Sequence, residues 1–255
     1  MLPGLYRALR DNIRLSRRQA CQVGAAMGLS LSTLLTFGLN KVFAKAMEPV
    51  NREKKTMDLV QPVFDGNVSL EKAIKQRRTV RSFTNKPISN QQFSQILWSA
   101  QGITDDRGFK RSAPSGGALY PSDVYAVVGE NCVETFISGV YHYNPSNHSV
   151  TSVAEGDRRK DVAGVSLGQM WMADAPVIFV VTAEYNRICT KYGKRGIRYA
   201  LIEMGHIGQN IFLQSQALGL EAGIVGAFND RAVADVVGVE KNHEPLVILP
   251  VGWKG

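Results

Sequence analysis

Apolar residues recur with helical spacing at two places in the first half of the chain. Residues 70–76 carry apolar side chains at positions i, i+3 and i+4, and the next position on that face is Arg77. Residues 90–101 follow a capping-box sequence, Ser89 with Gln92, and stop before Gly102. Both segments are therefore predicted to be helices, and the first is predicted to bring a guanidinium onto its core-facing side.

The longest helix is predicted over residues 195–218, with Gly219 ending it. Its repeating, core-facing positions are expected to be Ile197, Leu201, Met204, Gly208, Ile211 and Phe212. A short helix is expected to begin at Arg231. Glycines inside the long helix allow another helix to approach it closely.

Apolar runs between turn residues predict strands. The unbroken run over residues 175–184 is expected to be a central strand, covered on both faces. Shorter strands are expected over residues 124–128, 140–143, 150–153, 223–228 and 245–252. Strands separated by helices but unevenly grouped predict an α+β fold, a mostly antiparallel sheet with helices packed on it. This domain is expected to span residues 68–255, behind a polar linker or extended arm at residues 47–67.

The positive charge is concentrated at the beginning of the sequence. The 255 residues carry a net charge of +8, which by itself suggests nucleic acid or anionic lipid as a partner. Residues 1–46 hold seven Lys or Arg and one acid, so they carry +6 and leave +2 for the remainder. A nearly neutral body argues against a nucleic-acid partner.

Residues 1–46 resemble an export signal of the twin-arginine type. Arg17 and Arg18 precede a moderately apolar, uncharged run at residues 19–40, and Ala44-Lys45-Ala46 has the small-x-small form of a cleavage site. The protein is therefore expected in the periplasm or cell envelope. The alternative is an uncleaved membrane anchor, because the uncharged run approaches the ~20 residues that span a bilayer.

No metal site is expected. Cys132 and Cys189 lack the spacing of metal ligands, and the four histidines form none of the usual metal-binding patterns. The two cysteines could form a disulfide or remain separate thiols.

Two basic stretches offer contacts for an anion. Arg77, Arg78, Thr79 and Arg81 combine guanidinium groups with a hydroxyl, a donor set suited to phosphate. A solvated basic helix end explains the same residues. Lys254 follows the last predicted strand and adds a cation.

Two glycine-containing turns offer free backbone amides. Ser115 and Gly116 belong to the turn Pro-Ser-Gly-Gly, which cannot continue a helix and lets backbone approach a planar ligand. Val225, Gly226 and Ala227 lie at the tip of a predicted short strand. The turn with Ser115 and Gly116 could also be an ordinary turn.

Taken in order, these segments resemble the nitroreductase-like flavin enzymes and, within them, the SagB-type dehydrogenases. The resemblance covers residues 68–255 and rests on RRTVRSF, APSGGALYPSDVYAV, ADAPVIFVVTAE, KYGKRGIRYALIEMGHIGQN, LGLEAGIVGAF and LPVG. It implies a nitroreductase-like sandwich with FMN bound at the interface of a homodimer. Ala118 stands where wider nitroreductases often have Asn, as is usual for the SagB-type branch.

The resemblance also implies roles for single residues. Arg77, Arg78 and Thr79 match contacts to the phosphate and ribityl chain, and Arg81 matches the cation beside flavin N1 and O2. Gly226 and Ala227, preceded by Val225, match the amides that face flavin N5 and O4. The turn with Ser115 and Gly116 approaches the ring, and Lys254 resembles the C-terminal contact to the phosphate.

Lys191 and Tyr192 resemble a catalytic Lys-Tyr pair. The resemblance implies that the substrate gives a proton to one of them and a hydride to flavin N5, before an unidentified acceptor reoxidises the flavin. The substrate is expected to be a small molecule or peptide-derived. The structural alternative for this pair is a surface lysine beside a half-buried tyrosine. There are two functional alternatives for the protein: an NAD(P)H-dependent nitro or quinone reductase, and a non-catalytic flavin-binding envelope protein.

Overall fold

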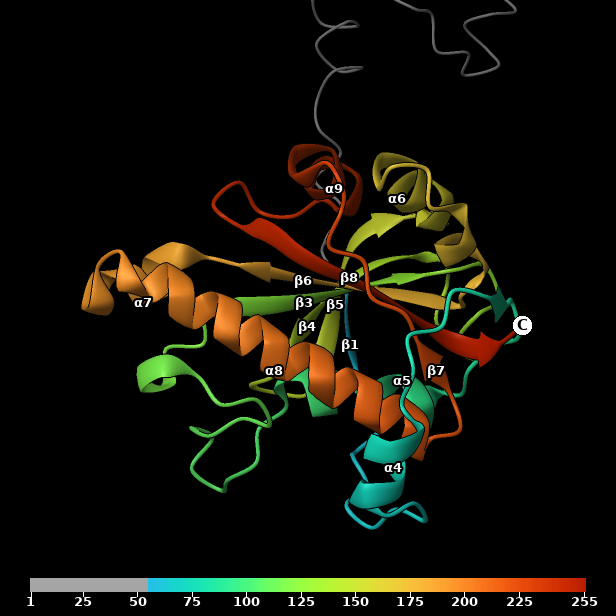
Figure 1. Cartoon of the computed structure of the whole chain (residues 1–255), viewed down its shortest axis with the longest axis horizontal. Coiled ribbons are helices and arrows are strands. Elements are labelled where there is room, and N and C mark those ends of the chain that lie inside the picture. Colours follow the sequence, from blue (N-terminus) through green and yellow to red (C-terminus); the bar gives the residue numbers. More distant parts are fainter. Residues whose placement is uncertain (1–54) are drawn as a thin grey trace, which may run out of the picture. The chain divides into compact units, whose positions relative to one another are not determined.

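The computed structural model describes residues 55–255, so the predicted export segment lies outside the described residues. The described chain forms an eight-stranded sheet whose strands run β1-β5-β4-β3-β6-β8-β2, with β7 paired to β8 (Figure 1). Every pair of named strands is antiparallel, which confirms the predicted sheet type. The strands are β1 (Thr56–Asp58), β2 (Phe83–Thr84), β3 (Ser122–Val128), β4 (Gly139–Asn144), β5 (Ser149–Glu155), β6 (Val177–Ala183), β7 (Glu221–Ala222) and β8 (Glu244–Lys254).

Helices cover both faces of the sheet, so the predicted α+β sandwich is confirmed (Figure 1). One face carries α4, α5 and α8, and the other carries α6 and α9. The helices are α4 (Leu70–Gln76), α5 (Asn90–Gln101), α6 (Arg159–Val165), α7 (Tyr185–Tyr192), α8 (Arg195–Ala217) and α9 (Asp230–Val237), with short 3-10 turns at Gly116–Ala118 and Met170–Asp174. No helix within residues 55–255 is both long and apolar enough to cross a membrane.

The central strands are buried on both faces because their side chains alternate between two cores. Phe179 of β6 packs in the core beneath α5 and α8, whereas Val180 belongs to the core beneath α6 and α9. All seven residues of β6 are buried, as the unbroken apolar run predicted. β6 lies between β3 and β8, so it is a central strand.

The ends of α4 and α5 confirm the local sequence signals. The Ser89 hydroxyl accepts a hydrogen bond from the Gln92 amide at 3.1 Å, and the Gln92 side chain accepts one from the Ser89 amide at 2.9 Å. This reciprocal pair starts α5, and Gly102 follows its last residue. α4 ends at Gln76 as predicted, but its predicted core-facing side is wrong, because Leu70 and Ile74 are 60% and 54% exposed and Ala73 alone is buried in this helix. Arg77 leaves the helical conformation with φ −48° and ψ 124°.

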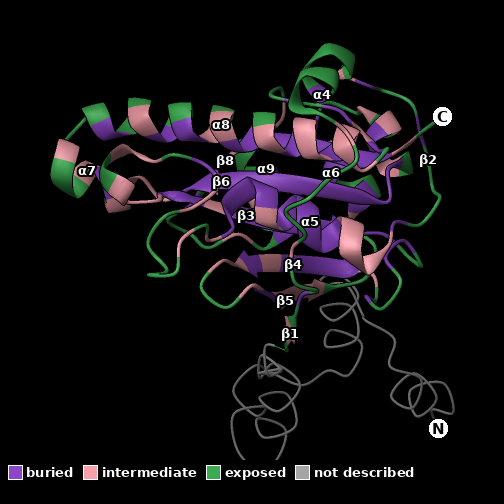
Figure 2. Ribbon diagram, turned by 90° about the horizontal axis from the view of Figure 1, so that it is seen from below, coloured by how far each residue is buried: buried purple, intermediate pink, exposed green. Residues whose placement is uncertain are grey.

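The predicted core-facing stripe of α8 is wrong in its first half. Ala200 and Glu203 are buried there, whereas Ile197 and Leu201 are 43% and 44% exposed. Figure 2 shows the buried face of α8 toward the sheet and the exposed positions on the opposite side. The helix is therefore rotated about its axis relative to the prediction. Gly196 accounts for this rotation, because a Cβ there would lie only 2.9 Å from Cys189 of α7, and the helix must turn its glycine toward that neighbour.

One other prediction needs correction. The strand predicted over residues 223–228 is absent; β7 ends at Ala222, and within that stretch Val225 alone forms an isolated bridge, to Ile248. The segment still follows β8, because the Gly223 amide donates to the Pro250 carbonyl at 2.8 Å. Gly223 also packs closely on its other side, where a Cβ would lie 2.7 Å from the Val80 carbonyl oxygen. The polar arm also contributes structure, because Thr56–Asp58 forms edge strand β1 on β5.

Candidate functional site

The basic residues predicted to hold an anion gather at one edge of the sheet. β2 pairs with the end of β8, with Phe83 opposite Lys254. Just before β2, the Val80 amide donates to the Ala222 carbonyl of β7 at 3.0 Å. These pairings bring residues 77–81 and Lys254 to the same edge, which is called the basic edge below.

The arginines of the basic edge differ in their contacts. The Arg77 guanidinium lies over the Phe212 ring of α8 at 5.2 Å, so the half-buried side chain packs on an aromatic face. Arg78 donates from Nη1 to the carbonyl oxygens of Lys75 (2.9 Å) and Arg77 (2.8 Å). Arg81 is exposed. A cavity of about 550 Å³ opens beside Arg78, and its lining residues are Lys75, Gln76, Arg78, Gln216, Gly219, Leu220 and Glu221.

The segment with Val225, Gly226 and Ala227 follows β7, whose Ala222 carbonyl accepts from the Val80 amide. Val225 is held to β8 by reciprocal hydrogen bonds with Ile248 at 2.8 and 3.0 Å. Gly226 is exposed, and no atom lies within 4 Å of the position that a Cβ would occupy there. This open space leaves the backbone after Val225 free to meet a ligand.

The second group of predicted residues meets at the turn with Ser115 and Gly116. Gly117 has φ +64°, and a Cβ on it would lie 2.6 Å from the Tyr192 hydroxyl and 3.1 Å from Lys191 Nζ. The Lys191 ammonium lies 5.3 Å from the centre of the Tyr192 ring. Lys191 and Tyr192, at the end of α7, therefore lie directly against this turn, and the group is called the turn site below.

The basic edge and the turn site lie at opposite ends of α8. Tyr199, near the start of α8, packs edge to face on Tyr192 at 5.1 Å and adjoins Gly116. Gln216, near its end, lines the cavity of the basic edge. These two positions are separated by almost five helical turns, about 25 Å at the usual rise of 1.5 Å per residue. Within one chain, the predicted site residues therefore form two groups.

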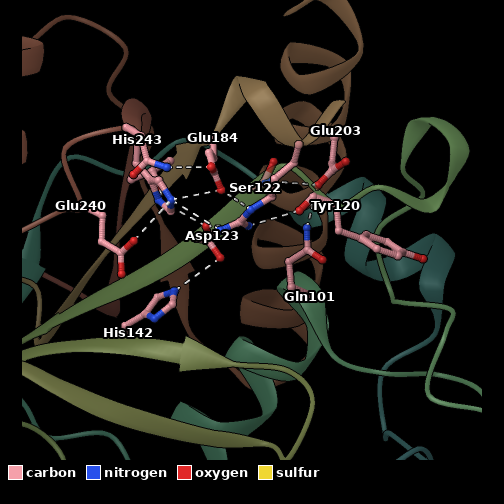
Figure 3. A network of polar contacts seen from close by, with 12 residues as sticks. Gln101, Tyr120, Ser122, Asp123, His142, Glu184, Glu203, Glu240 and His243 are labelled. Atoms are coloured by element: carbon pink, nitrogen blue, oxygen red, sulfur yellow. Dashed lines mark hydrogen bonds and ion pairs between the residues drawn. The ribbon is translucent and has the colours of Figure 1, made fainter. Parts of the chain in front are cut away.

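A polar network centred on Asp123 holds the start of α7 (Figure 3). Arg187 Nη1 lies 2.8 Å from Asp123, and Arg187 Nε lies 2.5 Å from Glu184. His142 and His243 approach the same aspartate at 3.4 and 3.3 Å. Burial opposes ionisation of Asp123, but the His142 hydrogen bond and the charge of Arg187 outweigh it, so the pKa of Asp123 is lowered. The network fixes the turn of α7 that precedes Lys191.

A second buried carboxylate lies under the turn site. Glu203 of α8 is 1% exposed and accepts hydrogen bonds from Gln101 Nε2 (3.0 Å) and the Ser122 amide (3.3 Å). Burial raises the pKa of Glu203, and hydrogen bonds from Ser115, Ser122 and Gln101 oppose the rise. Ser115 in turn accepts from the Tyr120 amide at 2.9 Å. The turn is thus held from the helix below it.

These two networks were not predicted from the sequence. Asp123, Arg187 and His243 lie far apart in the chain, and only the pairing of β3, β6 and β8 brings them together. Glu203 carried a usable signal, because it is an acid in an otherwise apolar helical segment. The predicted stripe of α8 did not include Glu203 among its core-facing positions.

A sequence model of the nitroreductase family matches residues 74–253. The chain belongs to the nitroreductase family. The matched range includes residues 77–81 of the basic edge and the whole turn site, and it ends one residue before Lys254. Members of this family are generally FMN-dependent oxidoreductases, so the match points to a flavin cofactor.

Several curated proteins are similar in sequence. A protein of Methanocaldococcus jannaschii described as a nitroreductase is 37% identical over 199 residues, which is 78% of this chain and 98% of that protein. The microcin B17-processing protein McbC of Escherichia coli is 28% identical over 165 residues, 63% of this chain and 61% of that protein. The similarity to McbC and to a trifolitoxin-processing protein of Rhizobium leguminosarum confirms the resemblance to the SagB-type branch.

Solved structures share the fold. A nitroreductase structure from Ralstonia eutropha has a TM-score of 0.70 at 24% identity, covering 81% of this chain and 92% of that chain. A chain in the E. coli microcin synthetase McbBCD complex has a TM-score of 0.62 at 24% identity, covering 88% and 86%. At these identities the similarity shows the fold alone.

Proposed function

We propose that the protein is an FMN-dependent oxidoreductase of the SagB-type branch that transfers a hydride between flavin and a small-molecule or peptide-derived substrate. The observation that carries the proposal is the contact between Gly117 and the Lys191–Tyr192 pair. A proton-transferring pair needs a position beside the reacting atoms, and this pair packs against the turn that the family resemblance assigns to the flavin ring.

The residues of the basic edge fit FMN. Arg77, Arg78, Arg81 and Lys254 supply cations for a phosphate, and the cavity of about 550 Å³ lined by Arg78 gives the ligand room. The open space at Gly226 suits backbone contact with a flat ring. When bound, FMN supplies the group that accepts or gives the hydride.

Residues of this chain can transfer the proton that accompanies the hydride. Lys191 and Tyr192 can exchange one with the substrate through Nζ and the phenol oxygen, which lie together at the turn. The Asp123–Arg187–Glu184 contacts hold the first turn of α7, so both side chains are presented from a fixed helix. Tyr199 packs on Tyr192 and limits its movement.

The separation of the two groups supports a homodimeric site. If the basic edge of one copy meets the turn site of the other, phosphate contacts and the proton-transferring pair surround one flavin. The exposed apolar side chains of α8, including Ile197, Leu201 and Ile202, supply surface for such contact. Each complete site would then contain residues from both copies.

The test begins with the absorbance spectrum of the purified protein and the mass of the released cofactor. We expect FMN at one per chain. Arg77→Ala should lower FMN affinity by about ten- to a hundredfold, because a charge-assisted hydrogen bond contributes roughly 1.5–3 kcal/mol. Full FMN occupancy in that variant would remove Arg77 from the site.

Lys191→Met and Tyr192→Phe test the catalytic role. Both variants should keep FMN and lose most of the turnover. If both retain wild-type turnover, Lys191 and Tyr192 are structural. If the wild type binds FMN but no donor bleaches it and no acceptor restores its colour, the protein is a flavin-binding module without catalysis.

A second candidate is an NAD(P)H-dependent reductase of nitro compounds or quinones. It is supported by the similarity to the FMN reductase [NAD(P)H] of Bacillus subtilis, which is 24% identical over 181 residues. Rapid bleaching of bound flavin by NADH or NADPH would favour this reading over the SagB-type one.

A further inference from the structure

One face of α8 follows the chain segment that leads into the turn site. The side chains on this face are four, three and four positions apart, so they lie along one side of the helix. In order, they are Tyr199, Glu203, His206 and Asn210. Each of them meets a different residue of the segment 112–116, and the two chains run in opposite directions.

Two of these side chains hold the backbone of the segment before the turn. Asn210 Nδ2 donates to the Ser112 carbonyl at 3.3 Å. One turn of α8 earlier, His206 Nδ1 donates to the Pro114 carbonyl at 3.3 Å. The start of the segment is therefore fixed to α8 at two points.

Glu203 is the buried acid of the same face. It is 1% exposed, and its Oε1 accepts from Gln101 Nε2 at 3.0 Å and from the Ser122 amide at 3.3 Å (Figure 3). The hydroxyl of Ser115, inside the turn, is a third donor to this carboxyl group. Glu203 thus joins the turn to α5 and to β3.

The surrounding contacts require an acceptor at this position. Arg111 Nη1 donates to Gln101 Oε1 at 3.2 Å, and a guanidinium can only donate, so the amide of Gln101 must turn its Nε2 toward Glu203. Arg111 also lies over the Tyr120 ring at 4.3 Å. The Tyr120 amide donates to the Ser115 hydroxyl at 2.9 Å, which leaves the proton of that hydroxyl for Glu203.

Stability alone does not account for a carboxylate here. Glu203 takes part in none of the ion pairs found within residues 55–255, and burial raises the pKa of this group. A carboxyl group whose pKa is raised by folding makes the fold less stable at neutral pH than the same group in solvent would. The advantage of Glu203 must therefore lie in what it holds in place.

We propose that Glu203 is a positioning residue, which fixes the turn site through Ser115. Gly117 follows Ser115 by two residues, and a Cβ on Gly117 would lie 2.6 Å from the Tyr192 hydroxyl. A turn released from Glu203 would therefore change the position of Tyr192. The inference rests on the proposed function, because it takes Tyr192 as part of the pair that transfers the proton.

The first measurement is hydrogen exchange of the Ala118 amide in the FMN-loaded protein, followed by NMR. This amide donates to the Ser115 carbonyl at 3.2 Å, so it reports on the turn itself. Glu203→Gln keeps the size of the side chain, but its amide nitrogen cannot accept from the Ser115 hydroxyl. We expect exchange of Ala118 to become about tenfold faster, while exchange in β6 changes by less than about twofold.

A double variant tests the route through Ser115. Ser115→Ala and Ser115→Ala/Glu203→Gln should exchange Ala118 at the same rate, because the first change already removes the hydroxyl on which Glu203 acts. Effects that add up would mean that Glu203 acts on the turn by another route, and the inference would be wrong.

The matched control is Asp157→Asn. It also replaces a carboxylate of a buried network with an amide, because Asp157 Oδ2 lies 2.6 Å from Nη2 of the buried Arg159 of α6, under the other face of the sheet. This variant should leave exchange of Ala118 within about twofold of the wild type. Equal acceleration in the control, or no acceleration in Glu203→Gln, overturns the inference.

A kinetic measurement shows whether the position of the turn affects the reaction. FMN-loaded protein is reduced with dithionite and mixed with menadione, which takes up a hydride and a proton to become its hydroquinone. Glu203→Gln should lower the limiting rate of flavin reoxidation about tenfold and leave the half-saturating menadione concentration unchanged. Faster exchange of Ala118 with an unchanged limiting rate would overturn the positioning role. The exchange measurements need no reaction, so they still decide whether Glu203 holds the turn if the protein carries no FMN, a result that would refute the proposed function.

Discussion

Gly117 is the residue at which the turn and the Lys191–Tyr192 pair touch. Gly117→Ala adds a methyl group at a position 2.6 Å from the Tyr192 hydroxyl, in a backbone conformation with φ +64°. We expect the variant to displace Tyr192 and to lose most turnover, with a stability cost of about 1–2 kcal/mol from the left-handed conformation. Steady-state turnover and thermal unfolding measure the two effects.

Gly168→Ala separates these effects. Gly168 has a similar φ of +68°, but no atom lies within 4 Å of the position of its Cβ. It should therefore show the same loss of stability with unchanged turnover. Equal turnover in the two variants would mean that contact with Tyr192 is not needed for catalysis.

Glu203 and Asp123 should respond to pH with opposite signs. Burial raises the pKa of Glu203 above 4.5, so the folded protein binds this proton more tightly than the unfolded chain. The free energy of unfolding then falls as pH rises through that range, by about 1.4 kcal/mol per pH unit between the two pKa values. Glu203→Gln removes this loss, so its stability relative to the wild type should improve from about pH 4 to about pH 7.

For Asp123 we expect the opposite dependence of the free energy of unfolding on pH, and Asp123→Asn tests it. The pKa of Asp123 is lowered below 3.8, so its ionised form stabilises the fold above that value and the stabilisation is lost as pH falls through the lowered pKa. The variant should be less stable than the wild type at about pH 7, and the difference should shrink below about pH 3.8. Denaturant titrations over a pH series give both slopes, and parallel slopes would contradict the contrast.

At the scale of single elements, the sequence predicted the start of α5 correctly from its capping residues, but it did not predict the rotation of α8 about its axis. Ser89 and Gln92 predicted the start of α5 because both partners lie within one turn, so no distant residue could change the outcome. The rotation of α8 depends on its contact with Cys189 of α7 at Gly196, which no local repeat contains. The pairing of Val225 also depends on a distant residue, Ile248, so the local sequence did not show that a single bridge forms where a strand was predicted.

The α5 cap gives an element-scale prediction. Ser89→Ala removes the acceptor of the Gln92 amide and should lower the free energy of unfolding by about 1 kcal/mol. Ser89 belongs to neither group of the candidate site, so FMN content and turnover should not change. Ser89→Asp can restore the acceptor and should recover the stability. Failure of that recovery would show that Ser89 acts through something other than its cap.

For the whole molecule, the division of the site predicts that separate copies are inactive. Ile202→Glu places a charge on the outer face of α8, where the wild-type side chain is 50% exposed. We expect wild-type protein to sediment as a dimer, and the variant as a monomer with weakened FMN binding. Ile137→Glu, at a position 72% exposed outside α8, is the control and should stay dimeric. A wild-type monomer with full FMN would refute the two-copy site.

The export prediction concerns residues outside the described range. FMN is made in the cytoplasm, so a route that carries folded protein would preserve a non-covalent cofactor during export. Arg17→Lys/Arg18→Lys should leave FMN-loaded protein in the cytoplasm, and wild-type processing should occur after Ala46. Normal export of the variant would contradict the twin-arginine reading, and full-length wild type in the membrane fraction would favour the anchor.

The position of β8 has a consequence for synthesis. β8 follows every other strand in the chain, yet it lies between β6 and β2 and also holds β7. Strands β3 to β6 can pair as they leave the ribosome, but one long edge of β6 stays open until residues 244–254 emerge. The basic edge closes only then, because Phe83 pairs with Lys254. Capture of the cofactor would be among the last steps of assembly, and chains released early would expose an apolar strand to aggregation.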